Sequence, residues 1–436
     1  MSAPATSLPT EPEFSSRRTY GSVALLIVIY TFAFIDRNIV NVLMQPIADE
    51  FDLTDTQLGF FGGTAFGIFY AVLGVPIARV ADRVSRKTII ALALVFWSAA
   101  TVLQAYAVGF LTLAIARVLV GVGEAGCSPP AHSMVSDMFE PSKRAKALGI
   151  YAFGIPIGGS LGVLIGSEMR EAFGWREALM VVGLPGILLG AIVMLLLKEP
   201  TRGYWEGGVA KRAAPAESMR DVYRFLARLP SFWHLAFAGA LHAFYGYGAA
   251  SFNPIFFERS HGMDPVYYGR IAATIGLTTG VLGTFLGGWL GDRYGARDVR
   301  SYPAVPGIGS VLTVPVVFAV YLAPTPELAL GLSLISSIAS GLYLGPTFGM
   351  TQAIVPPRMR AQAAAILLLV LNLIGLGLGP QFVGLLSDFL KPSYGVESVR
   401  WALLWTIAIG AAWSALHYWF ATKTLGRDLE AQKAIA

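Results

Sequence analysis

The chain has 436 residues, of which 55% are hydrophobic and only 14% are charged, and its mean hydropathy is +0.61. Soluble domains carry roughly 25% charged residues, so this composition excludes an ordinary soluble protein and indicates a chain that lives in a lipid bilayer. The net charge of +5 records membrane topology and gives no support for nucleic-acid binding.

Apolar runs of about 20 residues recur along the whole chain, and each is long enough to cross a hydrocarbon core about 30 Å thick as a helix. The pattern predicts an all-α membrane protein. The polar stretch 1–16 lacks the signal-peptide pattern, so the first span is expected to stay in the mature protein. Twelve spans are expected, near 20–45, 57–80, 88–107, 110–135, 145–168, 176–197, 231–258, 265–292, 301–322, 327–353, 361–388 and 399–421.

Most of the 32 Lys and Arg residues fall in loops on one side of this topology, if the N-terminus is placed in the cytoplasm. The first loop on the other side carries acids instead, such as Asp49 and Asp52. The positive-inside rule therefore predicts cytoplasmic N- and C-termini. The pattern fits a bacterial inner membrane.

The longest polar interval, residues 198–230, separates six spans from six. From Ser218 it offers a helix-capping Ser-x-x-Asp pattern, followed by apolar residues at helical spacing that predict an amphipathic helix on the inner membrane surface. The expected organisation is a disordered cytoplasmic tail (1–19), an N-terminal six-helix bundle (20–197), a cytoplasmic linker (198–230), a C-terminal six-helix bundle (231–421) and a cytoplasmic tail (422–436).

Reactive and metal-binding residues are scarce. The single cysteine, Cys127, excludes an intramolecular disulfide and is expected to pack as a small hydrophobe within an apolar helix. The five histidines lack metal-ligand spacing, and no phosphate loop, nucleophile elbow or paired-carboxylate arrangement is present. The sequence therefore gives no support for an enzyme, a metal site or a cofactor.

The two halves repeat one another. ARVADRVSRK follows the second span, at 78–87, and GWLGDRYGAR follows the eighth, at 288–297. A second echo, PSKRAKA at 141 and PPRMRAQA at 356, precedes spans five and eleven. These repeats predict two six-helix halves in the same orientation.

Twelve spans in two parallel halves, with an Asp-Arg-x-x-x-Arg/Lys loop after the second span of each, resemble the major facilitator superfamily. Within this superfamily the chain resembles the spinster family most. The motifs that carry this resemblance are Asp36-Arg37, R-x-x-x-G-x-G-E at 117–124, SPPAHSMVSDMF at 128–139 and GIPIGGSLGVLIGS at 154–167. The resemblance implies that spans one, four, seven and ten line a central cavity. It also implies proton-coupled movement of amphiphilic lipids, such as lysophospholipids or sphingoid phosphates, by alternating access.

Four charged residues are predicted to lie inside the membrane, in one layer: Asp36, Arg37, Arg117 and Glu124. Charges at this depth are costly and usually mark a functional pathway. In the resulting hypothesis Arg37 and Arg117 bind an anionic head group, while Asp36 and Glu124 exchange protons. Because adjacent residues point about 100° apart on a helix, Asp36 and Arg37 cannot both face the cavity. The alternative is a purely structural Arg117–Glu124 ion pair.

The repeated loop charges are predicted to gate the inner side by holding the halves together in one state. Two Gly-rich runs, 154–166 with Pro156 and 375–384 with Pro380, are expected to allow close helix packing and bending. The predicted gating residues are Asp82, Arg83, Arg86, Lys87, Asp292 and Arg293.

The second half lacks the charged pair, because Ser333 and Ser340 occupy the places of Arg117 and Glu124. A cavity with charge on one wall and apolar or aromatic residues on the other suits an amphiphile. Expected partners are a lipid or amphiphilic substrate, protons and the bilayer, without nucleic acid, and a monomer is expected. The alternatives are transport of small organic anions or drug-like compounds, or a membrane receptor or scaffold. The candidate aromatic residues are Phe244, Tyr245, Tyr247 and Tyr343.

Overall fold

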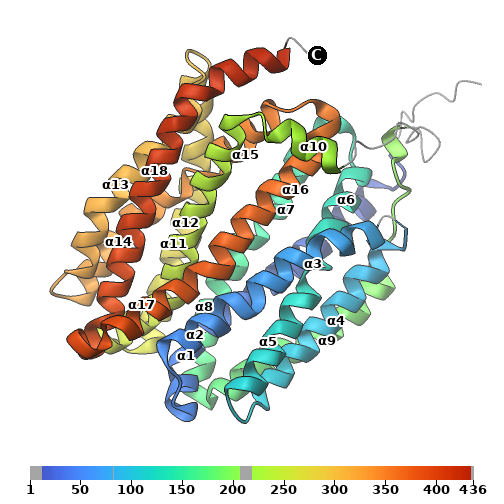
Figure 1. Ribbon diagram of the computed structural model, residues 1–436. Coiled ribbons are helices and arrows are strands. Elements are labelled where there is room, and N and C mark those ends of the chain that lie inside the picture. Colours follow the sequence, from blue (N-terminus) through green and yellow to red (C-terminus); the bar gives the residue numbers. More distant parts are fainter. Residues whose placement is uncertain (1–11, 82, 207–218, 434–436) are drawn as a thin grey trace, which may run out of the picture.

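The computed structural model describes residues 12–81, 83–206 and 219–433, and within these ranges the chain is helical, without a strand. Long helices stand roughly side by side in two groups, one from each half of the chain (Figure 1). This arrangement confirms the all-α membrane fold predicted from the apolar runs.

The first half forms six passes, three of them broken into shorter helices. Pass two combines α2, the π-helix η1 and α3; pass four combines α5 and α6; pass five combines α7 and α8. The elements are α1 (Ser16–Phe51), α2 (Asp55–Gly59), η1 (Phe60–Thr64), α3 (Ala65–Ala81), α4 (Arg86–Ala105), α5 (Phe110–Glu124), α6 (Ser128–Met138), α7 (Pro141–Ala152), α8 (Gly154–Phe173) and α9 (Trp175–Leu196).

The second half repeats this order after the linker. Pass ten combines α14 and α15, and pass eleven combines α16, the π-helix η5 and α17. The elements are α11 (Pro230–His261), α12 (Pro265–Gly295), α13 (Ser301–Tyr321), α14 (Pro326–Gly341), α15 (Leu344–Ala353), η4 (Pro357–Met359), α16 (Arg360–Val370), η5 (Leu371–Leu378), α17 (Gly379–Tyr394), η6 (Gly395–Glu397) and α18 (Ser398–Lys433).

Ten helical segments of the described chain are long and apolar enough to cross a membrane. The last of them, Arg360–Gln432, contains two passes, because the chain reverses at Gly395, whose φ of 56° suits a residue without a Cβ. The 32-residue helix α11 is not among those ten and supplies one further pass. The count of twelve passes is thus as predicted.

The breaks follow local sequence. The π-helices coincide with Gly-containing FFGGT and LNLIGLGL, and α6 begins just before a Pro-Pro pair. Cys127 is free and buried, as expected, but lies at the break before α6 and not inside a helix. The Gly-rich run of α8 packs closely against α1, as expected: a Cβ at Gly158 would lie 2.3 Å from the carbonyl oxygen of Thr31.

The linker carries the 3-10 turn η2 (Tyr204–Glu206) and the helix α10 (Met219–Leu226). The predicted cap Ser218 lies outside the described residues. The amphipathic pattern is present, but Val222 and Leu226 are fully buried in an apolar cluster with Phe232, Ile354 and Leu425. The apolar side of α10 therefore packs against the second half, which corrects the expectation that it faces lipid.

Candidate substrate and coupling site

The four predicted intramembrane charges come together at the centre of the first half. α1 supplies Asp36 and Arg37, and α5 supplies Arg117 and Glu124. Arg37 is 8% exposed and each of the other three is 1% exposed. Charges buried this completely need partners, because an unpaired ion in an apolar interior costs several kcal/mol.

Arg37 and Glu124 form the central ion pair. The Arg37 Nη2 atom lies 2.6 Å from Oε2 of Glu124. The guanidinium carbon also lies 4.7 Å from the ring centroids of Phe34, Phe66 and Tyr70. Three aromatic faces and one carboxylate therefore stabilise the cation.

Arg117 does not pair with Glu124 on its own helix. Seven residues correspond to about 10.5 Å along a helix axis, which is too far for a direct contact. Nη2 of Arg117 donates to the Arg37 carbonyl oxygen at 3.4 Å, and its Nε and Nη1 have no hydrogen-bond partner among the described residues. The structure therefore contains no Arg117–Glu124 ion pair.

Asp36 points away from its neighbour Arg37, as the helical geometry requires. The Thr101 hydroxyl of α4 lies 2.6 and 2.8 Å from the two carboxylate oxygens. Thr101 is fully buried. Sequence reasoning missed it, and a threonine at mid-helix gives no signal that would have found it.

A cavity of about 210 Å³ lies between the two halves. Drug-sized ligand sites occupy roughly 300–1,000 Å³, so this volume suits a head group better than a whole amphiphile. Arg37 is the one charged side chain of the lining, which does not include Asp36, Arg117 or Glu124. The lining residues are Phe34, Arg37, Asn38, Asn41, Gly62, Ile155, Gly159, Tyr247, Ala250, Ser251 and Leu376.

Neutral polar side chains extend the cavity lining beyond Arg37. Asn38 and Asn41 follow Arg37 on α1, and the Ser251 hydroxyl of α11 donates to Oδ1 of Asn41 at 3.3 Å. This bond crosses from one half to the other. The run of polar residues after Arg37 in an otherwise apolar span is a signal that sequence reasoning could have used.

Of the four candidate aromatic residues of the second half, one lines the cavity and three pack against other side chains. Tyr247 lines the cavity, whereas Phe244 packs on Phe382. Tyr245 bonds to His242 and Tyr343 stacks on the same imidazole, with ring centroids 4.2 Å apart.

Neutral groups replace the ion pair in the second half. Nε2 of His242 lies 2.7 Å from the Ser340 hydroxyl, and Nδ1 lies 2.7 Å from the Tyr245 hydroxyl. Ser333 donates to its own helix, at the carbonyl of Leu330. The charge asymmetry expected from the sequence is thus visible in the contacts.

The predicted gating residues lie on the side of the membrane where α1 begins and α18 ends, here called the terminal side (Figure 1). Arg86 is buried and bonds to Asp137 and Glu199, while the Lys87 ammonium donates to the Met194 carbonyl. Asp137 and Met194 belong to the first half, and Glu199 stands at the start of the linker that follows it. Asp82 lies outside the described residues.

The charged residues of the second-half motif likewise contact residues of their own half. Asp292 accepts a bond from the Tyr302 hydroxyl and Arg293 lies over the Trp289 ring, whereas Arg83 is exposed. Among the described residues, no hydrogen bond, ion pair or cation–π contact of the predicted gate joins one half to the other.

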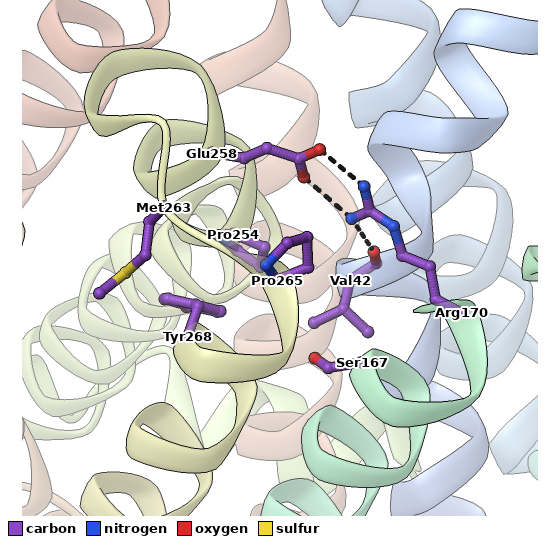
Figure 2. Close-up of a pocket in the computed structure, with 8 residues that line it drawn as sticks. All are labelled: Val42, Ser167, Arg170, Pro254, Glu258, Met263, Pro265 and Tyr268. Atoms are coloured by element: carbon purple, nitrogen blue, oxygen red, sulfur yellow. Dashed lines mark hydrogen bonds and ion pairs between the residues drawn. The ribbon is translucent and has the colours of Figure 1, made fainter. Parts of the chain in front are cut away.

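Ion pairs that join the halves lie at the other membrane side, here called the far side. Arg170 of α8 makes two bonds to the Glu258 carboxylate of α11, at 2.6 and 2.9 Å, and one to the Val42 carbonyl (Figure 2). The space beside them measures only about 10 Å³, room for about one water. Sequence reasoning missed this contact because neither residue sits in a repeated motif.

Asp55 is the centre of a second contact between the halves. It is 1% exposed, pairs with Arg259 at 2.8 Å and accepts a bond from the Ser387 hydroxyl. Asp388 of α17 accepts from the backbone N–H groups of Asp55 and Thr56, so a second-half carboxylate caps the first turn of α2. The described structure is therefore closed on the far side.

Comparison with known proteins assigns the chain to a family. Residues 26–380 match the model described as Major Facilitator Superfamily. The chain belongs to this superfamily. It is 31% identical to an MFS-type efflux pump of Mycolicibacterium smegmatis, over 98% of this chain and 99% of that protein. It is 29% identical to human protein spinster homolog 1, over 89% of this chain and 78% of that protein.

A solved structure agrees over the whole fold. The inward-facing, unoccupied form of a bacterial homolog to the human lysosomal transporter spinster superposes with a TM-score of 0.85 at 32% identity, covering 95% of this chain and 99% of that one. The chain is therefore a multi-pass membrane transporter of spinster type. This membership sets aside the receptor and scaffold alternatives.

Proposed function

We propose that the protein is a proton-coupled transporter of amphiphilic lipids with an anionic head, of the lysophospholipid or sphingoid-phosphate kind. One observation carries the proposal: Arg37 is both a cavity-lining residue and the partner of the buried Glu124 carboxylate. Protonation of Glu124 would neutralise that partner and free the guanidinium for a substrate anion.

The other two charges complete the cycle. Arg117 has unpartnered N–H groups beside Arg37 and is the second head-group residue, while Asp36 is the second proton-exchanging group. In the outward-facing conformation the terminal side is closed by the repeated loop charges. These are Asp82, Arg83, Arg86, Lys87, Asp292 and Arg293. Closure of the far side supports an inward-facing state in a bacterial inner membrane, with both termini cytoplasmic and the monomer as the working unit.

Transport across imposed pH gradients tests the proposal. Purified protein in proteoliposomes is assayed with a fluorescent lysophospholipid, and Asp36→Asn and Glu124→Gln are each expected to abolish the proton dependence of flux. Unchanged proton dependence in both variants would contradict the coupling role. Arg37→Gln should weaken lipid binding while Arg83→Gln, at an exposed loop position, should not.

A second cargo, a small organic anion or drug-like compound, is favoured by the relative named an efflux pump. Mass spectrometry of native lipid that copurifies with the protein discriminates the two. Bound lysolipid, displaced by added lysophospholipid, supports the first function. Competition by water-soluble anions alone supports the second.

A further inference from the structure

The buried face of α4 carries polar groups in a line. Trp97, Thr101 and Gln104 are spaced by four and three residues, so they share one face of the helix. All three are fully buried. Thr101 contacts Asp36, and Gln104 follows it by three residues, about 4.5 Å nearer the far side.

Gln104 is unusual because its side chain has no hydrogen-bond partner. Neither Nε2 nor Oε1 bonds to any described residue. An amide left buried and unpaired costs about 1–3 kcal/mol. The next residues along the chain, Ala105 and Ala107, belong to a buried apolar cluster with Leu43 and Leu179. Packing alone would favour leucine or methionine at this position.

Polar atoms continue from Gln104 to the far surface. The Ala107 carbonyl accepts a bond from Nη2 of Arg176 at 3.3 Å. Arg176 pairs with Glu50, and both side chains are at least one-third exposed. The α4 face therefore runs from Asp36 to the solvent of the far side.

The charges around Asp36 differ between its two sides. On the cavity side, Arg37 of α1 lines the cavity and holds Glu124, and Arg117 of α5 donates to the Arg37 carbonyl oxygen. Two guanidinium groups oppose the entry of a positive charge from the cavity. On α4, the groups that face Asp36 are neutral, and the next charges in that direction are Arg176 and Glu50.

We infer that Gln104 and Thr101 form the path by which protons from the far side reach Asp36, separate from the substrate cavity. This rests on the proposed coupling role of Asp36. Amide and hydroxyl groups both donate and accept, so they can order bridging water. A hydronium proton passes along this water to the Asp36 carboxylate, forming one O–H bond there and leaving neutral water behind.

Trp97 lies at the other end of this polar face of α4, toward the terminal side. The indole N–H of Trp97 donates only and cannot accept a proton. It likewise has no hydrogen-bond partner among the described residues. The path therefore opens toward Gln104 and stops at Trp97.

The test follows protonation of Asp36 directly and needs no substrate. Purified transporter is subjected to a rapid drop in pH, and the carboxylic-acid carbonyl band is followed by infrared spectroscopy, with Asp36→Asn assigning the band. Gln104→Met, of similar volume without polar atoms, is expected to slow the rise of the Asp36 band at least tenfold. Trp97→Phe is the matched control and should leave the rate unchanged.

The outcomes separate the two proposals. If Asp36→Asn removes no band, Asp36 does not titrate and its proposed coupling role fails. If the band is present and Gln104→Met is as fast as wild type, the path through Gln104 is wrong. Replacing an unpaired amide should leave the melting temperature equal or higher. A Gln104→Met protein that fails to fold would show a structural role and would also overturn the inference.

Discussion

The centres of the two halves occupy equivalent places in a repeated fold but use different chemistry. The first half holds Arg37 and Glu124 in a 2.6 Å ion pair, whereas the second holds His242 between Ser340 and Tyr245 by two 2.7 Å hydrogen bonds. An ion pair in an apolar interior depends on both charges being present, while a satisfied neutral network tolerates loss of one bond. We therefore expect the first half to respond to protonation and the second half to serve as a structural support.

The largest expected effect comes from neutralising the charged centre. Glu124→Gln leaves the Arg37 guanidinium buried without its counter-ion, which costs about 3–5 kcal/mol. The melting temperature in detergent should fall clearly, and lipid flux should fall at least tenfold. Glu50→Gln, at the exposed far end of α1, is the control and should change neither. A Glu124→Gln protein with wild-type melting temperature and flux would remove the distinction between the halves.

The second prediction breaks the contact between the halves. Asp55→Asn weakens the bond to Arg259 across the far side, and loss of about 1–3 kcal/mol of coupling should favour far-side opening. Because Cys127 is buried, Ala250→Cys supplies a single reactive reporter in the cavity. Its labelling by an impermeant maleimide from the far side should rise about tenfold in the Asp55→Asn background.

The control for this experiment is Arg176→Gln. It removes an ion pair at the same membrane side, but one that lies wholly in the first half. Equal labelling in both variants would show that surface charge, and not the link between halves, controls opening.

The sequence predicts the fold well because bilayer solvation imposes it. Twelve apolar runs and two repeated loops suffice for twelve helices in two halves. The candidate site is predicted less completely. Asp36, Arg37, Arg117 and Glu124 are conspicuous as charges in apolar spans, but their partners are not. Pairing of Glu124 with Arg37 depends on helix rotation, which tertiary packing decides.

The remaining gaps have the same origin. Thr101 and Gln104 resemble ordinary polar residues of a span until their burial is known. The far-side link of Asp55 to Arg259 joins residues about two hundred positions apart. No local pattern signals a contact of that kind.

A third, smaller effect tests the neutral centre. Ser340→Ala removes one of the two bonds to His242 and should cost about 1 kcal/mol of stability. The pH profile of lipid flux should keep its wild-type shape, because no charge is disturbed. A shifted profile would show that the second half takes part in proton coupling, and Ser333→Ala, which removes only a bond within α14, provides the comparison.

The smallest effect concerns the repeated loops, where the halves also differ. Burial disfavours ionisation of Glu199, but the Lys87 backbone N–H, the Arg86 guanidinium and the Ser85 hydroxyl hold its pKa below the usual value. A depressed carboxylate pKa stabilises the folded state above the unfolded-state pKa, roughly 4.3, and this contribution is lost as pH falls further. Glu199→Gln should therefore lower stability by about 0.5 kcal/mol at pH 7, with the difference in melting temperature shrinking as the pH falls below about 4. Asp292→Asn, near the end of α12, affects only an exposed bond from the Tyr302 hydroxyl and should lower stability less at pH 7. An equal loss in the two variants would mean that the two copies of the motif contribute alike.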